Sequence, residues 1–430
     1  MKIKVIDKSY EEVLAIKPEP HIKPKTPNWL FKTLLKIVSS PDLWATRFSM
    51  DSEGLEKIGS GEPCLYLMNH SSFIDLEIVG SVLYPRNFNI VATSDGFIGK
   101  PWLMRQIGCI PTKKFIPDLM LVRDMEYALN TLKNSVVMFP EAGYSFDGTA
   151  TVLPETLGKC IKFLKVPVVM IKTEGAYTRD PLYNNLQRRR VKVSAKMTAL
   201  FSKDEVLSTD ADEIQRVIEE QFTFDHFRWQ KENGVRVKAP FRADYLNRLL
   251  YKCPHCNAEG RTEGRGIKLL CHACGKEYRM TMLGEMLATE GETAFTHIPD
   301  WYRWERESVR AEIERGEYHV DVPVEIMAAV DLKHLYRIGE GRLVHNENGF
   351  LLTGCGGKLK YQQKPLASYS LNADFNWYEI GDMVCIGNNK VLYYCIPKTK
   401  GDIVAKMRLA AEEIYKIKKA EKNLHKEHEE

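Results

Sequence analysis

The sequence predicts an α/β domain followed by a four-cysteine module and a small β-rich domain with a C-terminal helix. Three observations support this division. Between residues 50 and 225, short apolar runs alternate with segments of helical periodicity, which is typical of α/β layer folds. Two CxxC pairs follow within residues 250–281. Between residues 298 and 420, several short alternating segments precede one helical pattern.

Length and composition agree with a multidomain globular protein. The chain has 430 residues, more than one ordinary domain contains. Apolar residues make up 44% and charged residues 27%, a balance that argues against wholesale disorder. The 61 Lys and Arg residues exceed the 57 Asp and Glu residues by only 4, so the net charge does not indicate a dedicated nucleic-acid-binding protein.

Residues 1–49 are expected to form an N-terminal arm and an amphipathic segment. Four prolines within residues 1–28 favour an extended arm. In the segment that follows, Pro41 is expected to end a helix, and the segment combines apolar side chains (Trp29, Phe31, Leu34, Leu35, Trp44, Phe48) with basic ones (Lys32, Lys36, Arg47). Such a helix either packs on the core or lies in a membrane interface with its lysines near phosphates, and periodicity does not separate the two interpretations.

Within residues 50–225 each apolar run is assigned to a strand or a helix. The expected strands are Cys64–Met68, Asn89–Ala92, Ser135–Phe139, Val166–Lys172 and Arg190–Ala199. The expected helices are Leu119–Lys133, Glu155–Leu164 and Asp210–Phe222.

The last part of the chain predicts a helix, several strands and a closing helix. The first helix is expected near Pro299–Arg315, and the closing helix carries Ile403, Met407, Ala410, Ile414 and Ile417 on one side. The charged C-terminal stretch is expected to fray into solvent. The expected strands are His319–Ile326, Arg342–His345, Gly349–Thr353, Ala367–Leu371, Asn376–Ile380 and Val391–Ile396. This order of elements is similar to a pleckstrin-homology-like layout.

Two patterns bear on the compartment. No apolar run reaches the roughly 20 residues of a membrane-spanning helix, and the N-terminus lacks an apolar core of signal-peptide length. Six of the ten cysteines are scattered rather than spaced as a disulfide framework. We therefore expect a cytoplasmic protein with reduced thiols.

The strongest catalytic candidate is the stretch Asn69–Asp75, which directly follows the expected strand Cys64–Met68. A histidine at a strand end can act as a general base near neutral pH. Asp75, five residues after His70, can accept a hydrogen bond from the other ring nitrogen and stabilise the imidazolium. Ser71 and Ser72 are possible caps of the following helix. Taken alone, the stretch is also compatible with an ordinary structural histidine near a helix start.

Four sequence blocks in this order resemble the glycerophospholipid acyltransferase family, which includes the lysophosphatidic acid acyltransferases. The NHxxxxD block is met in full by Asn69, His70 and Asp75. A Gly-x-Ile-Pro stretch precedes the basic pair Lys113 and Lys114. The FPEGTRS block is matched at Phe139, Pro140, Glu141 and Ser145, and a Val-Pro-Val strand stands at residues 166–168. The resemblance covers roughly residues 30–225.

The resemblance implies a mixed sheet flanked by helices and a one-step acyl transfer. His70 would remove the proton from an acceptor hydroxyl, and Asp75 would orient His70. The acyl donor would be acyl-CoA or an acyl carrier protein, and the acceptor a lysophospholipid-like molecule reached at the cytoplasmic membrane surface. The residues expected to bind substrate are Asn69, Lys113, Lys114, Glu141 and Ser145.

The match has one departure, at Tyr144, where the family has an arginine of the acceptor-phosphate site. Tyrosine cannot make a bidentate phosphate contact, which leaves the acceptor's head group open. Residues 188–190 are three arginines that form either replacement charge or a solvated loop. The sequence leaves two other functional classes open: a catalytically inactive lipid-binding or scaffold protein, and a nucleic-acid-associated protein.

The second strong pattern is the pair of CxxC motifs, Cys253/Cys256 and Cys271/Cys274, separated by 14 residues. Two such pairs can each hold one edge of a tetrahedral Zn²⁺ with a hairpin between them. Four thiolates close the coordination sphere, so the predicted zinc is structural. Zinc ribbons also occur in nucleic-acid machinery, which is the origin of the nucleic-acid alternative, but the near-neutral charge disfavours it and no nucleic-acid partner is expected.

Overall fold

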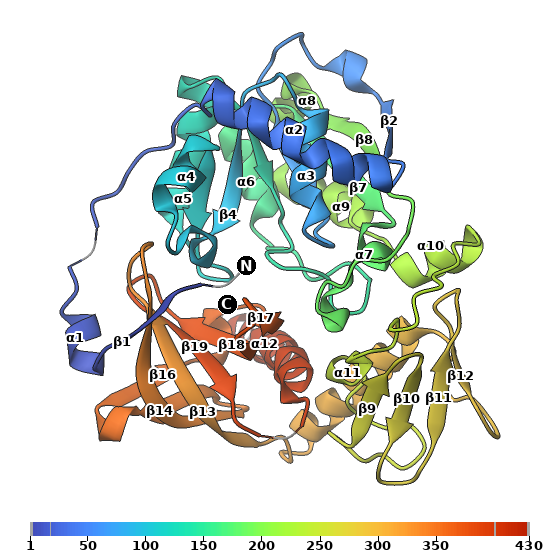
Figure 1. Ribbon diagram of the computed structural model, residues 1–430. Coiled ribbons are helices and arrows are strands. Elements are labelled where there is room, and N and C mark those ends of the chain that lie inside the picture. Colours follow the sequence, from blue (N-terminus) through green and yellow to red (C-terminus); the bar gives the residue numbers. More distant parts are fainter. Residues whose placement is uncertain (1–2, 18, 400, 428–430) are drawn as a thin grey trace. The chain divides into compact units, whose positions relative to one another are not determined.

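The computed structural model describes residues 3–17, 19–399 and 401–427. The chain folds into two compact units, and Figure 1 shows its course through them. The first comprises His21–Leu182 and Leu186–Ala239 and is called the acyl unit after the family that its sequence blocks resemble. The second, here the ribbon unit, comprises Met1–Pro20, Tyr183–Asn185 and Pro240–Glu430.

The acyl unit is built on a seven-stranded mixed sheet. Its strands, in spatial order, are β2 (Ser49–Glu53), β8 (Ser194–Phe201), β7 (Val168–Glu174), β3 (Leu65–Met68), β6 (Ser135–Met138), β4 (Phe88–Thr93) and β5 (Cys109–Thr112). Only β7 and β8 run antiparallel. All four residues of β3 are buried, as expected for a central strand covered on both faces.

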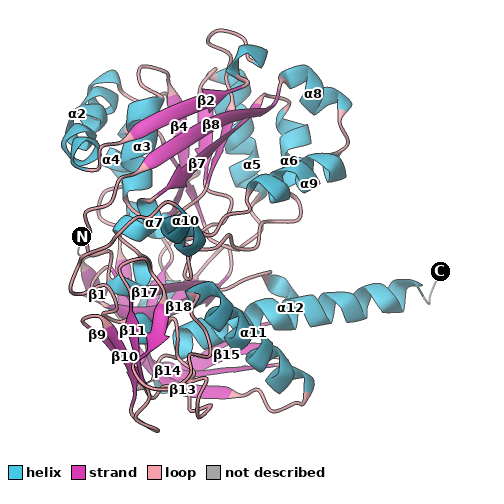
Figure 2. Ribbon diagram, turned by 90° about the vertical axis from the view of Figure 1, so that its right-hand side faces the viewer, coloured by secondary structure: helices cyan, strands magenta, loops and turns pink. Residues whose placement is uncertain are grey.

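Helices cover both faces of this sheet. They are α2 (Trp29–Ala45), α3 (Ile74–Val82), α4 (Pro101–Gln106), α5 (Leu119–Glu126), α6 (Leu157–Leu164), α7 (Ala176–Arg179), α8 (Lys203–Ser208), α9 (Ala211–Gln221) and α10 (His226–Glu232). In Figure 2, α2, α3 and α4 lie on one side of the strands, and α5, α6 and α9 on the other. Leu65, Val136 and Val168 share one buried cluster with Ile161 of α6 and Ile214 of α9.

The central strands and helices agree with the sequence-based expectations, and the differences lie at the sheet edges. The edge strands β2 and β5 were not expected. All five residues of β2 are exposed, so it carries no apolar pattern, and β5 has only four residues. The last strand begins at Ser194 instead of residue 190. Register with neighbouring strands, rather than local pattern, defines these edges.

The sequence suggested that Pro41 ends the amphipathic helix, and this expectation was wrong. Pro41 lies inside α2, which continues to Ala45. The proline removes one backbone donor, but tertiary packing holds the last turn, where Leu43 is buried. The helix also packs closely on α3, because a Cβ at Gly80 would lie 2.8 Å from a methyl carbon of Leu35.

The ribbon unit contains two sheets. The four-stranded ribbon sheet comprises β9 (Thr262–Arg265), β10 (Lys268–Cys271), β11 (Glu277–Met280) and β12 (Met286–Ala288). The eight-stranded sheet comprises β1 (Val5–Asp7), β13 (Val320–Ala329), β14 (Leu335–Asn346), β15 (Gly349–Gly354), β16 (Leu359–Gln363), β17 (Asn372–Trp377), β18 (Gly381–Gly387) and β19 (Leu392–Pro397). The helices are α1 (Tyr10–Leu14), α11 (Ile298–Glu314) and α12 (Ile403–Glu427).

Three expectations for this unit were wrong. The strands expected at residues 367–371 and 376–380 are displaced: residues 367–371 lie outside any strand, and of residues 376–380 only Asn376 and Trp377 are in a strand, at the end of β17. The backbone turns between β17 and β18, where Tyr378 and Glu379 have positive φ. The N-terminal arm is not simply extended: β1 pairs with β14, and α1 follows it. The charged C-terminal stretch does not fray within the described residues but stays helical to Glu427.

Four alternating charges join the ribbon to the helices of its unit. Lys252 contacts Glu259 at 3.3 Å and Glu312 of α11 at 3.6 Å. Lys406 of α12 contacts Glu259 at 2.6 Å and Glu312 at 2.7 Å. Each cation therefore bridges the same two carboxylates, and the ribbon is fixed to α11 and α12.

Among the described residues, no helix is long and apolar enough to cross a lipid bilayer.

Candidate active site and candidate metal site

The acyl unit brings the sequence blocks to one edge of its sheet. Strands β3, β6, β4 and β5 are parallel neighbours, so their carboxyl ends meet at the same edge. His70 follows β3, Glu141 follows β6 and Lys113 follows β5. This edge is where open α/β sheets bind their ligands.

His70 and Asp75 form a hydrogen-bonded pair. His70 Nδ1 lies 3.0 Å from Asp75 Oδ2, and the same oxygen accepts hydrogen bonds from the backbone N–H groups of Ser71 at 2.7 Å and Ser72 at 3.0 Å. Because Asp75 Oδ2 accepts hydrogen bonds from two amides, it also acts as the acceptor toward His70. Nδ1 is therefore assigned as the ring nitrogen that carries the proton. His70 Nε2 therefore carries the lone pair, as a general base requires. The Asp75 side chain is fully buried, whereas that of His70 is 23% exposed.

The sequence suggested Ser71 and Ser72 as caps of α3, but their side chains do not cap this helix. The helix begins after Phe73 without a side-chain cap. Instead, Asp75 in its first turn reaches back and binds both serine amides. The same carboxylate thus ends the loop, starts the helix and orients His70.

Two aromatic rings enclose the His70 imidazole. Phe139 stacks on it with 4.2 Å between ring centroids, and Tyr144 lies 4.3 Å away at a 44° tilt. Tyr144 is the residue at which the sequence departs from the family motif. The His70 ring therefore has an aromatic neighbour at the position where the family motif has a cation.

The turn after β6 supports His70 through Glu141 and Ser145. Glu141 Oε2 accepts from the His70 backbone N–H at 2.9 Å, and its other oxygen accepts from the Thr151 N–H at 2.9 Å. The Ser145 backbone N–H donates to the His70 carbonyl at 3.1 Å, and its hydroxyl donates to the Thr149 carbonyl at 2.6 Å.

Asn69 ties the end of β3 to β7. Its Oδ1 accepts from the Thr173 backbone N–H at 2.7 Å, and its Nδ2 donates to the Thr173 carbonyl at 3.1 Å. Asn69, Glu141 and Ser145 are all fully buried. They were expected to bind substrate. Their polar atoms bind the protein itself in this structure, which fits a positioning role, and their contact with substrate stays a prediction.

Lys113 and Lys114 are partly buried and lie farther along the same edge. Strand β5 is three strands from β3, which corresponds to about 14 Å at the usual strand spacing. Burial lowers the pKa of Lys113, while the Asp118 carboxylate acts in the opposite direction. This separation suits contacts to a distant part of a long substrate rather than to its reacting hydroxyl.

His226 is a neighbour of the site that the sequence reasoning missed. It begins α10, just beyond the expected domain boundary at residue 225, and its Nε2 lies 3.2 Å from the Ser71 hydroxyl. Burial lowers its pKa to about 4, so it is neutral at physiological pH. The available signal was Asp225, whose side chain caps α10 by accepting from the Arg228 N–H.

The four predicted zinc ligands lie close together, Cys271 at the end of β10 and the other three in the turns beside the ribbon sheet. Cys253, Cys256, Cys271 and Cys274 place their sulfur atoms within 4.8 Å of one another. The Cys253–Cys274 and Cys256–Cys271 sulfur distances are 3.8 and 3.7 Å. Tetrahedral Zn²⁺ with Zn–S bonds of about 2.3 Å requires sulfur atoms roughly 3.8 Å apart, so the residues fit this metal.

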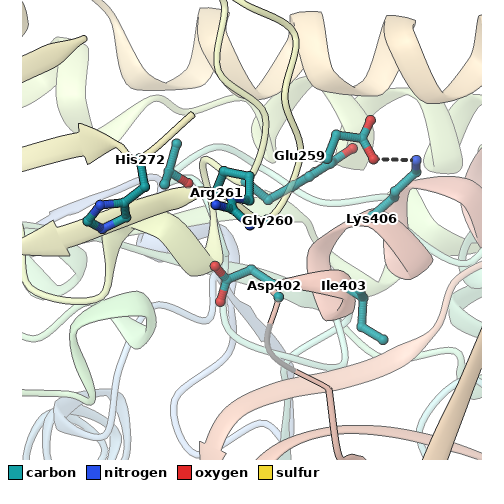
Figure 3. A pocket seen from close by; sticks show the side chains of 10 residues that line it. Glu259, Gly260, Arg261, His272, Asp402, Ile403 and Lys406 are labelled. Atoms are coloured by element: carbon teal, nitrogen blue, oxygen red, sulfur yellow. Dashed lines mark hydrogen bonds and ion pairs between the residues drawn. The ribbon is translucent and has the colours of Figure 1, made fainter. Parts of the chain in front are cut away.

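A pocket of about 430 Å³ lies between the ribbon and the start of α12 (Figure 3). Arg261 and His272 line it from the ribbon, and Asp402, which directly precedes α12, and Lys406 of α12 line it as well. Lys406 is already paired with Glu259, and His272 with Glu263 at 2.7 Å. Because acids and bases are mixed and largely paired, the lining does not select one class of ligand.

Comparison with known proteins gives a consistent result for the acyl unit. Residues 49–171 match the family model described as Acyltransferase. The chain is 28% identical over 143 residues to the chloroplastic 1-acyl-sn-glycerol-3-phosphate acyltransferase BAT2 of Brassica napus, covering 31% of this chain and 41% of that protein. It is 30% identical over 116 residues to the chloroplastic 1-acyl-sn-glycerol-3-phosphate acyltransferase LPAT1 of Arabidopsis thaliana, covering 25% and 32%. The chain thus spans less than half the length of these curated relatives.

A solved structure is also similar to part of the chain. The crystal structure of the 1-acyl-sn-glycerophosphate acyltransferase PlsC of Thermotoga maritima matches with 18% sequence identity and a TM-score of 0.36. The match covers 48% of this chain and 80% of that one.

Proposed function

Because residues 49–171 form a domain of the acyltransferase family, we propose that the protein is an O-acyltransferase that acts on a lysophospholipid-like acceptor. The observation that carries the proposal is the His70–Asp75 pair, held at 3.0 Å at the carboxyl edge of the sheet with Nε2 left to act as a base. The curated relatives, both acyltransferases by name, support the reaction class.

The chemistry requires one base and no protein nucleophile. His70 Nε2 takes the proton of the acceptor hydroxyl while that oxygen attacks the carbonyl carbon of the acyl thioester. The tetrahedral intermediate collapses, the carbon–sulfur bond breaks, and the imidazolium returns its proton to the leaving thiolate. Asp75 keeps Nδ1 protonated and stabilises the imidazolium between the two transfers. The donor is acyl-CoA or an acyl carrier protein, both of which are thioesters.

We further propose that α2 carries the protein to a membrane surface. One face of the helix packs on α3, and the other exposes Trp29 at 71% and Trp44 at 87%. The remaining exposed apolar side chains of the helix are Leu30, Leu34, Ile37 and Val38. Trp102 of α4 is 64% exposed and contacts Phe31 with 5.6 Å between ring centroids. Exposed aromatic and aliphatic side chains on one helix are typical of interfacial binding.

The apolar side chains that face solvent are partly different from those that the sequence suggested, and the lysines do not point to a membrane surface. Phe31, Leu35 and Phe48 are partly buried, and Leu30, Ile37 and Val38 are exposed instead. Lys32 Nζ donates to the Pro85 carbonyl at 2.7 Å, and Lys36 Nζ to the Ser81 carbonyl at 3.2 Å. The two lysines hold the helix on the protein, so apolar contact supplies most of the proposed membrane binding.

We also propose that the four-cysteine group binds one structural Zn²⁺. The metal would hold the two halves of the ribbon together through thiolate bonds, with no open coordination position for catalysis. The zinc takes no part in acyl transfer in this proposal, because its four ligands already complete a tetrahedron.

Replacement of His70 tests the proposed reaction. The purified His70→Ala protein should lose roughly 10²–10⁴-fold in acyl-transfer rate, with an unchanged circular dichroism spectrum. The acceptor is found first by mass spectrometry of lipids from cells with and without the gene, and then assayed with acyl-CoA and acyl carrier protein donors. Retention of more than a tenth of the wild-type rate on that acceptor would refute the assignment.

A further inference from the structure

The loop that carries His70 makes one side-chain contact with a residue far along the chain. The Ser71 hydroxyl lies 3.2 Å from Nε2 of His226, the first residue of α10. Ser71 is fully buried and His226 is 2% exposed. Asn69 Nδ2 donates to the same hydroxyl at 3.4 Å, which leaves the serine proton for His226 Nε2. The proposed reaction gives this buried pair no direct task.

Ser71 connects the pair to the reacting group through its backbone. Its N–H donates to Asp75 Oδ2 at 2.7 Å, and the same oxygen lies 3.0 Å from His70 Nδ1. A rotation of the Ser71 backbone would carry this N–H away from Asp75 and would move His70, its neighbour in the chain. A contact that holds the Ser71 side chain therefore also holds the amide that fixes the Asp75 carboxylate.

The backbone beside His226 holds the second loop of the site. The His226 N–H donates to the Gly148 carbonyl at 2.9 Å, and Thr149 forms an isolated antiparallel bridge with Asp225. Gly148 and Thr149 belong to the loop after β6, which also carries Tyr144. The start of α10 is thus attached to both loops, to the loop after β3 through the His226 ring and to the loop after β6 through its main chain.

Two aromatic rings fix the direction of the His226 imidazole. Tyr177 stacks on it with 5.5 Å between ring centroids and 8° between the planes, and Phe224 lies 5.0 Å away at a 45° tilt. The Tyr177 hydroxyl donates to the Phe146 carbonyl at 2.9 Å, so the stacking ring is itself held. Gly148, with φ +82°, allows this close packing, because a Cβ there would lie 2.9 Å from the Tyr177 ring.

A serine beside a histidine can also be a nucleophile and its base. Burial argues against that use, because the Ser71 side chain has no exposed surface, whereas that of His70 is 23% exposed. Burial also lowers the pKa of His226 to about 4, so the ring stays neutral near pH 7. A neutral, buried ring can hold the serine without adding a charge to the site.

We propose that His226 is a positioning residue for acyl transfer: through the Ser71 hydroxyl it holds the loop that presents His70, and through its main chain it ties that loop to the one after β6. The inference rests on the proposed function, since it assigns His226 a role in the same site. Without the ring contact, the Ser71 amide binds Asp75 less firmly and the His70 ring leaves its productive orientation. A misoriented base slows the chemical step more than it weakens substrate binding.

Removal of the contact from either side tests this role. His226→Phe keeps a ring against Tyr177 but has no nitrogen, and Ser71→Ala keeps the backbone N–H but has no hydroxyl. Each should lower kcat roughly 5- to 30-fold, with KM changed less than about twofold. Because both remove the same contact, the double variant should fall no further than the more affected single variant. His226→Gln, whose amide can replace Nε2, should recover most of the loss.

The His70 ring gives a second readout, which needs no turnover. Histidine is labelled with ¹⁵N in the full chain, the His70 signals are identified by their loss in His70→Ala, and spectra are recorded at a pH where imidazole is neutral. The wild-type shifts should show the proton on Nδ1. In His226→Phe and in Ser71→Ala they should move toward a mixture of the two neutral tautomers, because Asp75 holds Nδ1–H less firmly. A failure of acyl transfer itself appears in the His70→Ala rates, so the two failures remain distinguishable.

His345→Phe is the matched control. His345 lies in the ribbon unit, is 1% exposed, and has its Nδ1 2.8 Å from the Tyr318 hydroxyl. Its loss removes a similar buried contact and should lower the unfolding temperature, but kcat and the His70 tautomer should stay as in the wild type. If His226→Phe does not fold, Ser71→Ala, which removes a single oxygen atom, carries the test.

Three results would overturn the proposal. They are an equal loss of kcat in the His345→Phe control, losses that multiply in the double variant, and an unchanged His70 tautomer in Ser71→Ala.

Discussion

At the scale of single residues, the site is a small set of side chains with divided tasks. His70 presents a free Nε2, Asp75 accepts three hydrogen bonds on one oxygen, and the buried residues Asn69, Glu141 and Ser145 fix the loops around them. Function in this arrangement depends on which atoms are left unbound by the protein. His70, the proposed base, is the one residue of this set that is not fully buried.

The first residue-scale prediction concerns Asp75. Asp75→Asn keeps the side chain's size but replaces the acceptor of Nδ1–H with an amide, which no longer stabilises the imidazolium. It also weakens the two serine amide bonds at 2.7 and 3.0 Å. We expect kcat to fall about 10²-fold or more, with less effect on KM, as measured by steady-state kinetics on the identified acceptor. A rate equal to that of the wild type would show that Asp75 does not orient His70.

The second residue-scale prediction concerns Tyr144. Its ring lies 4.3 Å from that of His70, so an acceptor hydroxyl bound at His70 would meet an aromatic face. Tyr144→Phe should keep most of the activity, and Tyr144→Arg should raise the relative kcat/KM for acceptors bearing a phosphate monoester, because arginine can hold that group bidentately. The ratio of kcat/KM for lysophosphatidate and a lysophospholipid diester measures this effect. An unchanged ratio in Tyr144→Arg would show that Tyr144 does not determine which acceptor is used.

At the scale of elements, α2 shows how one helix can serve two surfaces. Leu43 and Ser39 are buried and Leu35 meets Gly80 of α3, while the tryptophans at both ends are exposed. The sequence offered packing and membrane contact as alternatives. The structure shows a packed helix whose opposite face is still apolar.

The prediction for α2 follows from its exposed face. Trp29→Ser combined with Trp44→Ser should reduce sedimentation with anionic vesicles several-fold while changing the melting temperature little, because both side chains are mostly exposed. The matched control is Phe163→Ser with Leu207→Ser, which removes two exposed apolar side chains (54% and 45% exposed) from α6 and α8. Equal losses of vesicle binding in both double variants would place the membrane contact elsewhere.

At the scale of the whole molecule, the chain consists of two compact units, each with its own sheets and buried side chains. The ribbon unit gathers the cysteine module, the eight-stranded sheet and residues from the N-terminal arm. Its four-charge bridge connects the ribbon, α11 and α12, so we expect a change at the proposed metal site to affect the stability of that whole unit.

The prediction at this scale concerns zinc. The purified chain should contain about one zinc per molecule, and Cys253→Ser, which removes a fully buried ligand, should lose it. Calorimetry should then show a lower unfolding temperature for one transition, while the ¹⁵N signals of His70 stay unchanged because they report on the acyl unit. Serine in place of Cys355, a cysteine outside the cluster, serves as the control. A zinc-free preparation of unchanged stability would contradict the structural role.

Patterns that depend on near neighbours can be predicted from the amino-acid sequence. Runs such as Cys64–Met68 specify a buried strand, His70 and Asp75 are five residues apart in one loop and helix start, and each CxxC pair sets its own local geometry. These features follow from spacing along the chain, because the interacting groups are within one or two turns of each other.

Features that depend on residues far apart in the chain became visible only in the folded protein. The polar edge strand β2 is defined by its partner β8, β1 by its pairing with β14, and the passage of α2 through Pro41 by the burial of its last turn. His226 meets Ser71 across 155 positions, and Asp42 of α2 pairs with Arg179 of α7. Hydrogen bonds and packing between segments far apart in sequence fix these positions. The periodicity of the sequence does not predict them.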